Sequence, residues 1–430
     1  MGKTTRLLTL FTPVQALLLA SLAGLALTQK PKPNKGAVFW RNRTIYQLLT
    51  DRFYNTTPDI FLRHWQGGTF LGMIEKLDYI KEMGFDAIWI SPIVKNTELA
   101  FNTNGYHGYW MIDLYELSPH FGTSDDFKKL VAEVHKRDML MMVDIVANHG
   151  GPFWHNFSTF GYPLNESKYF HPYCNIFDID HRDNQWRMEK CWLAGLPDFN
   201  HEDPFVYDTL VKWIGNMTSY FDIDGLRIDT VPHVPHHFWA DFNKSSNVFQ
   251  VGECLDPRAK YVATYQNYLQ GEYKNFHSDW ICFNFQIFGF FLFLMFFVGM
   301  LNYPLYFAMI DSFAQSNSFR NLVKQVNENA ATFRDHKVLG NFIDNHDHNR
   351  FLHDNGNRKN ITRQALTFNF FMEGIPIMYY GTEQYFNGTG DPGSREPMLK
   401  NFTHTLLYNF TQTVVGIRKT NQVIIFFLAF

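Results

Sequence analysis

The chain has little charge and no excess of either sign. It carries 38 Lys and Arg against 41 Asp and Glu, a net charge of -3, and charged residues make up only 18% of 430. Basic patches are absent, which argues against a nucleic-acid partner. What the sequence does have is 46% hydrophobic residues, ample for a large buried core in one big domain.

Cysteine is also scarce, and the N-terminus suggests the compartment. Four cysteines allow three pairings, and spacing alone does not choose among them. Lys3 and Arg6 precede an apolar run from Leu7 to Leu27, which is typical of a secretory signal peptide over residues 1–26; the alternative is an uncleaved membrane anchor. Glycosylation sequons support a secreted, extracellular protein and begin at Asn42, Asn55, Asn156, Asn165, Asn216, Asn243, Asn360, Asn387, Asn401 and Asn409.

The stretch from Asp222 to His233 has the strongest chemical character. Within it, residues 225–229 read Gly-Leu-Arg-Ile-Asp, a short buried strand in which Arg227 and Asp229 point to the same face. Taken alone, such a pair is as well explained by a structural ion pair, because neither charge is buried cheaply without a partner.

Three further apolar runs end in polar and acidic clusters. They are residues 142–149 (Met-Val-Asp-Ile-Val-Ala-Asn-His), 251–256 (Val-Gly-Glu-Cys-Leu-Asp) and 342–347 (Phe-Ile-Asp-Asn-His-Asp). In this order and spacing the four blocks resemble those of the α-amylase family, glycoside hydrolase family 13, and most closely its secreted fungal type. The resemblance runs from about Thr44 to about Asn421.

Strand and helix patterns alternate, which predicts parallel strands with helical crossovers. The expected strands are Thr44–Leu49, Ala87–Ile90, Met139–Val146, Gly225–Ile228, Val248–Val251, a weak sixth at Leu301–Tyr303, Leu339–Ile343 and Ile375–Tyr379. The expected amphipathic helices include Met73–Met83, Asp125–Arg137, Phe205–Tyr220, Ile361–Met372 and Thr403–Arg418.

The α/β pattern and the resemblance together imply a TIM-type (β/α)8 barrel over residues 38–421. All four polar blocks would then lie at the carboxyl ends of strands, where such barrels place their chemistry. A small calcium-binding subdomain would be inserted after the third strand, at about residues 150–200. The chain stops after the apolar tail 422–430, before the family's usual C-terminal antiparallel β domain, so either that domain is absent or the gene is read short.

Retaining cleavage of a glycosidic bond needs two carboxyl groups roughly 5 to 5.5 Å apart, one to attack and one to protonate the leaving oxygen. The resemblance implies that Asp229 is the nucleophile, Glu253 the general acid and base, and Asp347 the carboxylate that supports the transition state. Arg227 would hold Asp229 ionised and oriented. Crowding by the other two carboxylates would raise the pKa of Glu253, as a general acid requires.

The resemblance also implies residues that bind the sugar. His149 and His346 match the family's sugar-binding histidines, although either alone is more often a core residue. Tyr109 and Trp110, in the segment Tyr-His-Gly-Tyr-Trp, would offer aromatic walls. More distant matched contacts are Gln47, Asp391 and Arg395. Pro232 stands where the family carries a lysine on the leaving-group side, which implies a different product pattern.

A structural calcium ion is implied as well. Its matched ligands are Asn148, Glu189, Asp198 and the main-chain oxygen of His233, all oxygen donors of the kind that a hard cation prefers. The resemblance further implies a disulfide between Cys174 and Cys191, and we expect Cys254 to be a packed thiol outside it.

One segment does not match the family. Ile281 to Leu301 is uncharged and dense in Phe, long enough for a membrane span, yet it falls between the fifth and sixth strands, where a span would disrupt a barrel. We interpret residues 272–299 as a translated intron, because the join of Gly271 to Met300 resembles the family without a gap. Codons for Gly271–Tyr273 can contain a donor-like site, and the Phe-rich run can encode a pyrimidine tract.

These observations predict a secreted, monomeric α-amylase that cleaves internal α-1,4 bonds of starch, glycogen and related glucans. Three alternatives remain open, and one is that the chain as written misfolds and only the properly spliced protein is the enzyme. An α-glucosidase or maltogenic relative would share the motifs and differ in its products. A non-catalytic, membrane-linked relative would make the Phe-rich span real, although the intact Asp229, Glu253 and Asp347 argue against it.

Overall fold

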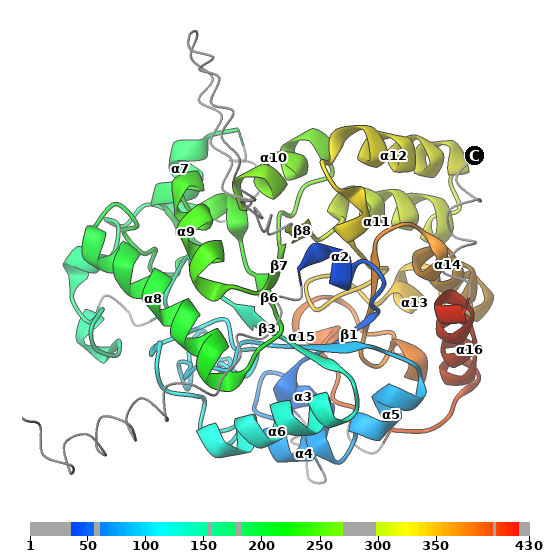
Figure 1. Cartoon of the computed structure of the whole chain (residues 1–430), viewed down its shortest axis with the longest axis horizontal. Coiled ribbons are helices and arrows are strands. Elements are labelled where there is room, and N and C mark those ends of the chain that lie inside the picture. Colours follow the sequence, from blue (N-terminus) through cyan, green and yellow to red (C-terminus); the bar gives the residue numbers. More distant parts are fainter. Residues whose placement is uncertain are drawn as a thin grey trace, which may run out of the picture. The chain divides into compact units, whose positions relative to one another are not determined.

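In the part of the chain that the structure describes, eight parallel strands form one sheet at the centre (Figure 1). This computed structural model describes residues 36–55, 61–152, 156–176, 183–269, 298–398 and 401–420. The sheet order is β8-β7-β6-β3-β2-β1-β10-β9. A parallel bridge between Leu301 and Gly340 joins its two outer strands and closes the barrel. The predicted TIM-type (β/α)8 fold is therefore confirmed.

The strands of the barrel are short. They are β1 (Ile45–Leu48), β2 (Ala87–Ile90), β3 (Leu140–Ile145), β6 (Gly225–Ile228), β7 (Phe249–Gly252), β8 (Gly299–Met300), β9 (Gly340–Asn341) and β10 (Ile375–Tyr379). The described helices are α2 (Ala37–Trp40), α3 (Thr50–Phe53), α4 (Phe70–Ile74), α5 (Leu77–Glu82), α6 (Ser124–Lys136), α7 (Gln185–Lys190), α8 (Pro204–Phe221), α9 (His236–Ser246), α10 (Ala259–Leu269), α11 (Tyr303–Met309), α12 (Phe319–Thr332), α13 (Phe351–Asp354), α14 (Lys359–Phe371), α15 (Gly390–Gly393) and α16 (Leu406–Thr420).

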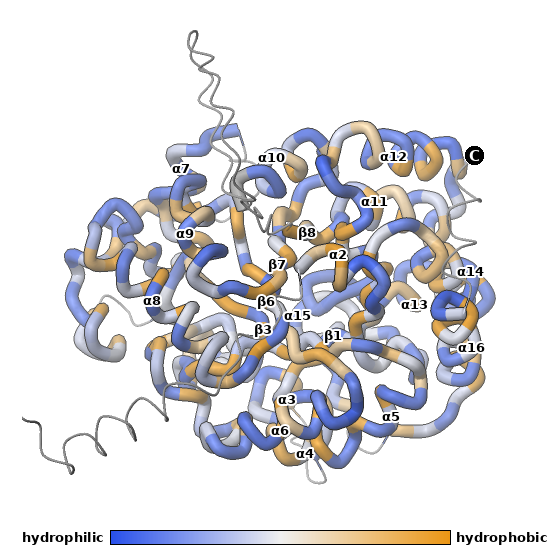
Figure 2. Tube along the Cα trace, in the orientation of Figure 1, coloured by the Kyte–Doolittle hydropathy of each residue, from blue (hydrophilic) through white to orange (hydrophobic). Residues whose placement is uncertain are grey.

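Alternation along each strand separates two apolar layers. The inward face of the barrel carries one buried cluster, and the outward face packs under the helices in a second, larger one. In Figure 2 the central strands are largely apolar, whereas the surrounding helices also present hydrophilic positions. Members of the inner cluster are Ile45, Ala87, Trp89, Leu140, Met142, Phe249, Val251, Ile375 and Ile377.

The inward face becomes polar toward the carboxyl ends of β3, β6 and β7. On β3, Leu140 and Met142 are followed two residues later by Asp144, and on β7 the inward Val251 is followed by Glu253. On β6, Arg227 and then Asp229 continue the face that begins at Gly225. Because of strand periodicity, the polar residues lie together at the carboxyl end of the barrel.

Trp40 closes the opposite end. It is fully buried in the inner cluster and stacks on Phe249, with 5.1 Å between the ring centres. A Cβ on Gly225 would lie 2.9 Å from the Trp40 ring, so this position of β6 requires glycine for a close approach.

Several predicted elements begin or end one or two residues away from the observed bounds, and three differ more. The helix expected over 73–83 is two helices, α4 and α5, because Lys76 between them leaves helical geometry (φ -118°, ψ 6°). The last helix begins at Leu406 rather than Thr403, because the Thr405 hydroxyl accepts from the Tyr408 amide and caps it. The sixth barrel strand, expected over 301–303, lies at Gly299–Met300, and Tyr303 already begins α11.

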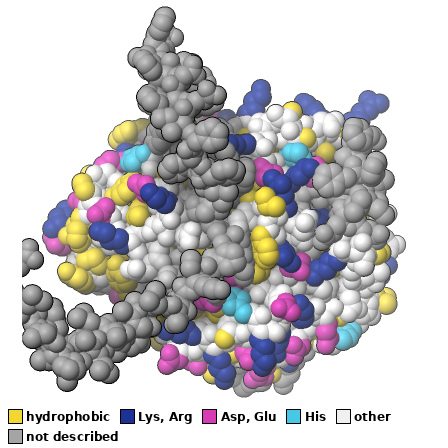
Figure 3. Space-filling view, viewed as in Figure 1, with side chains coloured by type: hydrophobic (Ala, Val, Ile, Leu, Met, Phe, Trp, Pro, Cys, Tyr) yellow, Lys and Arg dark blue, Asp and Glu magenta, His cyan; other side chains and the backbone are white. Residues whose placement is uncertain are grey.

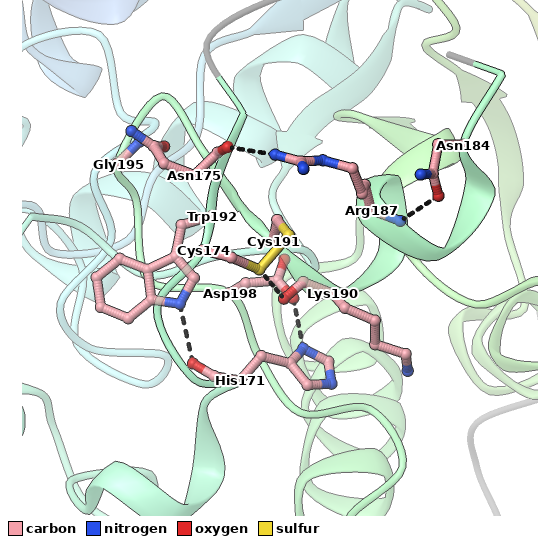
Figure 4. Close-up of a disulfide and its surroundings, with 10 residues drawn as sticks. All are labelled: His171, Cys174, Asn175, Asn184, Arg187, Lys190, Cys191, Trp192, Gly195 and Asp198. Atoms are coloured by element: carbon pink, nitrogen blue, oxygen red, sulfur yellow. Dashed lines mark hydrogen bonds and ion pairs between the residues drawn. A yellow bond between two sulfur atoms is a disulfide. The ribbon is translucent and has the colours of Figure 1, made fainter. Parts of the chain in front are cut away.

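The insertion between β3 and β6 carries its own small sheet. Strands β4 (Asn175–Ile176) and β5 (Trp192–Leu193) pair in parallel, and α7 lies between them in sequence. Figure 4 shows the disulfide that joins Cys174 to Cys191, with 4.8 Å between the Cα atoms, so the predicted pairing is confirmed. Cys254 is buried, as expected for a packed side chain.

Several predictions fall partly or wholly outside the described residues. They are the signal peptide over 1–26, the apolar tail 422–430 and the Phe-rich segment 272–299 except for its last two residues, Val298 and Gly299. Within the described ranges, no helix is both long and apolar enough to cross a membrane. On the face drawn in Figure 3, Lys and Arg side chains are interspersed with Asp and Glu rather than gathered in a basic patch.

Candidate active site

One guanidinium organises the polar end of the barrel. Arg227 is fully buried, and its Nη1 lies 2.9 Å from Asp144 Oδ1 and 2.7 Å from Asp229 Oδ1. Its Nη2 lies 2.8 Å from Glu253 Oε1. Asp229 and Glu253, on neighbouring strands as predicted, thus share one cation. The sequence alone was equally consistent with a simple ion pair of Arg227 and Asp229. The structure instead shows one buried cation that contacts three carboxylates.

Thr230 is a second link between the same two carboxylates. Its amide donates to Glu253 Oε2 at 3.1 Å, and its hydroxyl donates to Asp229 Oδ2 at 3.0 Å. Thr230 adopts a left-handed conformation with φ 46°, which is uncommon for a β-branched residue and is typical of functional sites. Each carboxylate is therefore held at both oxygens, and its orientation is set before any ligand binds.

Burial raises the pKa of two carboxyl groups in this cluster, Glu253 and Asp144. It raises the pKa of Glu253 to about 8, with the charges of Asp229 and Asp347 adding to the rise and Arg227 opposing it. Burial likewise raises the pKa of Asp144 to about 7. At neutral pH the protonated form of Glu253 is therefore favoured.

Asp347 lies at the more open side of the cluster, with its side chain 32% exposed. Arg395 Nη2 lies 3.4 Å from its Oδ1, and His346 Nε2 lies 3.3 Å from its Oδ2. Partial burial acts to raise the pKa of Asp347, but His346, Arg395 and Arg227 hold it below its usual value. Arg395 also pairs with Asp391 at 3.2 Å, so two predicted contact residues flank this carboxylate.

The predicted sugar-binding residues gather in the same place. Gln47 Nε2 lies 2.8 Å from His346 Nδ1, and the rings of Tyr109 and His346 stack with 5.2 Å between their centres. The Tyr109 hydroxyl donates to Asp144 at 2.6 Å. Trp110 is half-buried beside them, edge-on to the His107 ring at 4.6 Å. His149 Nε2 lies 3.2 Å from the carbonyl oxygen of Tyr109.

Three of the predicted calcium ligands converge. The Asn148 amide oxygen lies 2.9 Å from Asp198 Oδ1 and 2.9 Å from the main-chain oxygen of His233. Oxygens that face one another without a hydrogen between them repel, unless the amide is turned by 180° or a cation lies among them.

The tautomer of His149 decides between these arrangements. As placed, Asn148 Nδ2 donates to His149 Nδ1 at 3.1 Å, which leaves the single ring proton on Nε2 to reach the Tyr109 carbonyl. Burial lowers the pKa of His149, so its ring carries one proton. Turning the amide would require the proton on Nδ1 and leave Nε2 facing a carbonyl as an acceptor. The contact of His149 with Tyr109 thus favours the converging oxygens when a cation lies among them, whereas without a cation the turned amide would donate to both Asp198 and the His233 carbonyl.

The fourth predicted ligand, Glu189, lies close to this cluster. Gln185 donates to Glu189 Oε1 at 2.6 Å and to the Pro232 carbonyl at 3.1 Å, which places Glu189 beside His233. Asp198 Oδ2 is paired with His171 Nδ1 at 2.6 Å, a contact drawn in Figure 4. Over the described ranges, no group of three or more His, Cys, Asp or Glu side chains could hold a metal ion, so amide and main-chain oxygens would be needed.

Sequence reasoning assigned no role to four residues of this network: Asp144, Thr230, Tyr303, and Asn345, whose amide donates to the Tyr303 hydroxyl. Asp144 follows the inward Met142 on β3 and is paired in register with Arg227, a signal that strand periodicity does contain. Tyr303 contacts Glu253 across 50 positions of the sequence, and no local pattern marks it.

Comparison with known proteins agrees with this geometry. Residues 47–422 match the family described as "Alpha amylase, catalytic domain". The chain is 38% identical over 405 residues to an alpha-amylase from Saccharomycopsis fibuligera, covering 89% of this chain and 75% of that one. It is also 38% identical to alpha-amylase 2 of Schwanniomyces occidentalis, covering 89% and 73%.

Solved structures show the same relationship. An alpha-amylase from Malbranchea cinnamomea superposes with a TM-score of 0.79 at 36% identity, covering 91% of this chain and 80% of that one. An alpha-amylase from Geobacillus thermoleovorans, solved with acarbose, gives a TM-score of 0.76 at 35% identity, with 90% and 80% covered.

Proposed function

The chain belongs to the α-amylase family of glycoside hydrolases that act on α-glucans, and on that premise we propose that it is a secreted, retaining endo-α-1,4-glucanase of starch, glycogen and related glucans. The observation that carries the proposal is the pair of carboxylates, Asp229 and Glu253, held on one guanidinium. The Geobacillus relative was solved with acarbose, which supports a sugar ligand for this chain.

The two carboxylates divide the work between two steps. Asp229 attacks the anomeric carbon while Glu253 gives its proton to the departing glycosidic oxygen, leaving the sugar bonded to Asp229. In the second step Glu253 removes a proton from water, whose oxygen then displaces Asp229 with net retention. Asp347 faces the developing positive charge on the sugar, and Gln47, Tyr109 and His346 orient the ring.

Digestion of soluble starch tests the reaction and its stereochemistry together. We expect proton NMR to show the α-anomer first, and chain length to fall faster than free glucose appears. Asp229→Asn should lower kcat by at least about 10³-fold, since the nucleophile is lost, whereas Asp208→Asn, on the exposed face of α8, serves as the matched control. Initial β-anomer, or an active Asp229→Asn variant, would contradict the mechanism.

The products separate this function from its nearest alternative. An α-glucosidase or maltogenic relative releases glucose or maltose from chain ends, so the iodine colour of starch would persist while reducing sugar accumulates. Pro232, at the position of the family lysine, makes the product pattern worth measuring with oligosaccharides of defined length.

A calcium ion is part of the proposal. Asn148, Asp198 and the His233 carbonyl supply converging oxygens, and Glu189 lies beside them, a donor set suited to Ca²⁺. When bound, the ion would tie the insertion to the barrel and relieve repulsion among these oxygens. Chelation should lower the thermal unfolding midpoint by several degrees, and added calcium should restore it. An unchanged midpoint would argue against the site.

Secretion is supported by the leader-like N-terminus, the glycosylation sequons and the disulfide, which is typical of oxidising compartments. Expression in a yeast host should release the chain into the medium, trimmed near residue 26 and sensitive to glycosidase treatment. Retention in a detergent-soluble membrane fraction would favour the membrane-linked alternative.

The catalytic unit is further proposed not to need residues 272–299. On either side of this segment, α10 and β8 lie together: Gln266 Nε2 donates to the Val298 carbonyl at 3.1 Å and to the Asp335 carbonyl at 3.0 Å. Removing 272–299 would place Gly271 directly before Met300, in the position of Gly299. That position requires glycine, because a Cβ there would lie 2.2 Å from the Val338 carbonyl oxygen.

Two measurements test this proposal. Transcripts sequenced across residues 265–305 should include a form without the segment. The chain lacking 272–299 should fold and cleave starch at least as well as the full chain. Loss of folding on deletion, with activity in the full chain and the segment present in every transcript, would show that the insertion belongs to the protein.

A further inference from the structure

Tyr303 contacts the proposed general acid but has no part in the mechanism above. It is fully buried where β8 gives way to α11. Its hydroxyl lies 3.3 Å from Glu253 Oε1 and 3.1 Å from Asn345 Nδ2. The ring packs edge-on against Phe342 at 5.1 Å. The hydroxyl is therefore a buried polar group aimed at a catalytic carboxyl.

The direction of these hydrogen bonds is determined by the backbone of Asp347. Its amide donates to Asn345 Oδ1 at 2.9 Å, which fixes which end of the Asn345 amide faces Tyr303. A primary amide nitrogen only donates, so the Tyr303 oxygen accepts from Asn345. The single hydroxyl proton of Tyr303 is then left to Glu253.

The geometry points to Tyr303 as a positioning residue that, oriented by Asn345, holds and tunes the carboxyl of Glu253 for its two opposite proton transfers. This inference rests on the proposed role of Glu253. A donor to Oε1 stabilises the carboxylate relative to the acid. It therefore favours the form of Glu253 that must remove a proton from water in the second step.

Some of the other groups around Glu253 lower its pKa, and others raise it. Arg227 and the Thr230 amide also favour the carboxylate, whereas burial, Asp229 and Asp347 favour the acid. Tyr303 adds a neutral donor to the groups that favour the carboxylate. It orients the Glu253 carboxyl without adding another charge. The chain Glu253–Tyr303–Asn345 ends on the backbone of Asp347, so it also joins two of the three carboxylates mechanically.

The decisive variant is Tyr303→Phe, which removes the hydroxyl and keeps the ring packing. Without this donor the pKa of Glu253 rises, so the basic limb of the kcat/KM profile should move up by about one pH unit. We expect kcat to fall roughly tenfold and KM to stay within about twofold, because Tyr303 is buried beneath the carboxyl rather than against substrate.

Tyr306→Phe is the matched control. Tyr306 lies one turn further along α11, is also buried and stacks on Phe342, and none of the described hydrogen bonds joins its hydroxyl to Glu253. Its basic limb should stay where the parent's is. If Tyr303→Phe leaves the limb unmoved, or moves it no more than Tyr306→Phe does, the inference is wrong.

A second variant covers a failure of Tyr303→Phe to fold. Asn345→Asp replaces the donor to Tyr303 with an acceptor that draws the hydroxyl proton away from Glu253. The negative charge of the new side chain also raises the pKa of Glu253. An unmoved basic limb in this variant overturns the inference. Glu253→Gln separates the two proposals: if that variant stays fully active, the proposed function itself fails, whatever Tyr303 does.

Discussion

Two buried glutamates lie on opposite sides of the barrel wall and differ in their partners. Glu253 lies inside, 7% exposed, beside Arg227 and a second carboxylate. Glu383 lies outside, fully buried, and accepts from the hydroxyls of Tyr46 at 2.8 Å and Tyr79 at 3.0 Å. Burial raises the pKa of both. A raised pKa is therefore common to both glutamates, and the catalytic role proposed for Glu253 rests instead on its paired carboxylate and shared cation.

The largest expected effect is on activity, and it distinguishes Glu253 from Glu383. Glu253→Gln should reduce kcat on starch by at least about 10³-fold, because the general acid is lost. Glu383→Gln keeps the shape and an acceptor for both tyrosines, and should leave kcat within about threefold. Steady-state rates of the two purified variants check this. A comparable loss in both would remove the functional distinction between them.

Glu253 contacts the cation Arg227, whereas the contacts described for Glu383 are tyrosine hydroxyls. Removal of the Arg227 charge should affect stability as well as activity. Arg227→Met leaves Asp144, Asp229 and Glu253 buried together without their cation. We expect about 3–5 kcal/mol less free energy of unfolding, the usual cost of breaking a buried pair from one side. Urea titration followed by circular dichroism measures it. A loss below about 1 kcal/mol would mean that the carboxylates are stabilised by protonation alone.

The pH profile sharpens the comparison further. Glu253 must be protonated to donate, so kcat/KM should fall as pH rises through about 8, where its raised pKa lies. The profile of Glu383→Gln should have the same basic limb as the parent, since Glu383 contacts hydroxyls outside the barrel. If the limb moves in Glu383→Gln, the two glutamates are coupled in a way that the contacts do not explain.

The smallest expected effect is on the pH dependence of folding stability. Because the folded pKa of Glu383 is raised above its unfolded value, its contribution to stability is fully present at low pH and is lost as pH rises through the folded pKa. The melting temperature of Glu383→Gln relative to the parent should therefore increase from about pH 4 upward, by a few degrees. Parallel melting curves at each pH would contradict this assignment.

Short-range regularities predicted the barrel and the meeting of inward polar residues at its carboxyl end, whereas the roles proposed for those residues come from the family resemblance. Alternation along β6 places Arg227 and Asp229 on one face, and similar alternation applies to Asp144 and Glu253. Helix boundaries were less predictable where a side chain intervened, as at Thr405. The sixth strand was misplaced because two residues carry too little pattern to locate it.

The residues of the sequence by themselves determined that a set of inward polar groups would meet at the carboxyl end of a parallel barrel, since strand periodicity and the common direction of the strands leave no other place for them. Only the tertiary structure decided which of these groups touch. Glu253 meets Tyr303 and Arg227, while Glu383 meets Tyr46 across 337 positions of the chain. Hydrogen bonds select partners by distance and direction in space, and neither is encoded in local sequence.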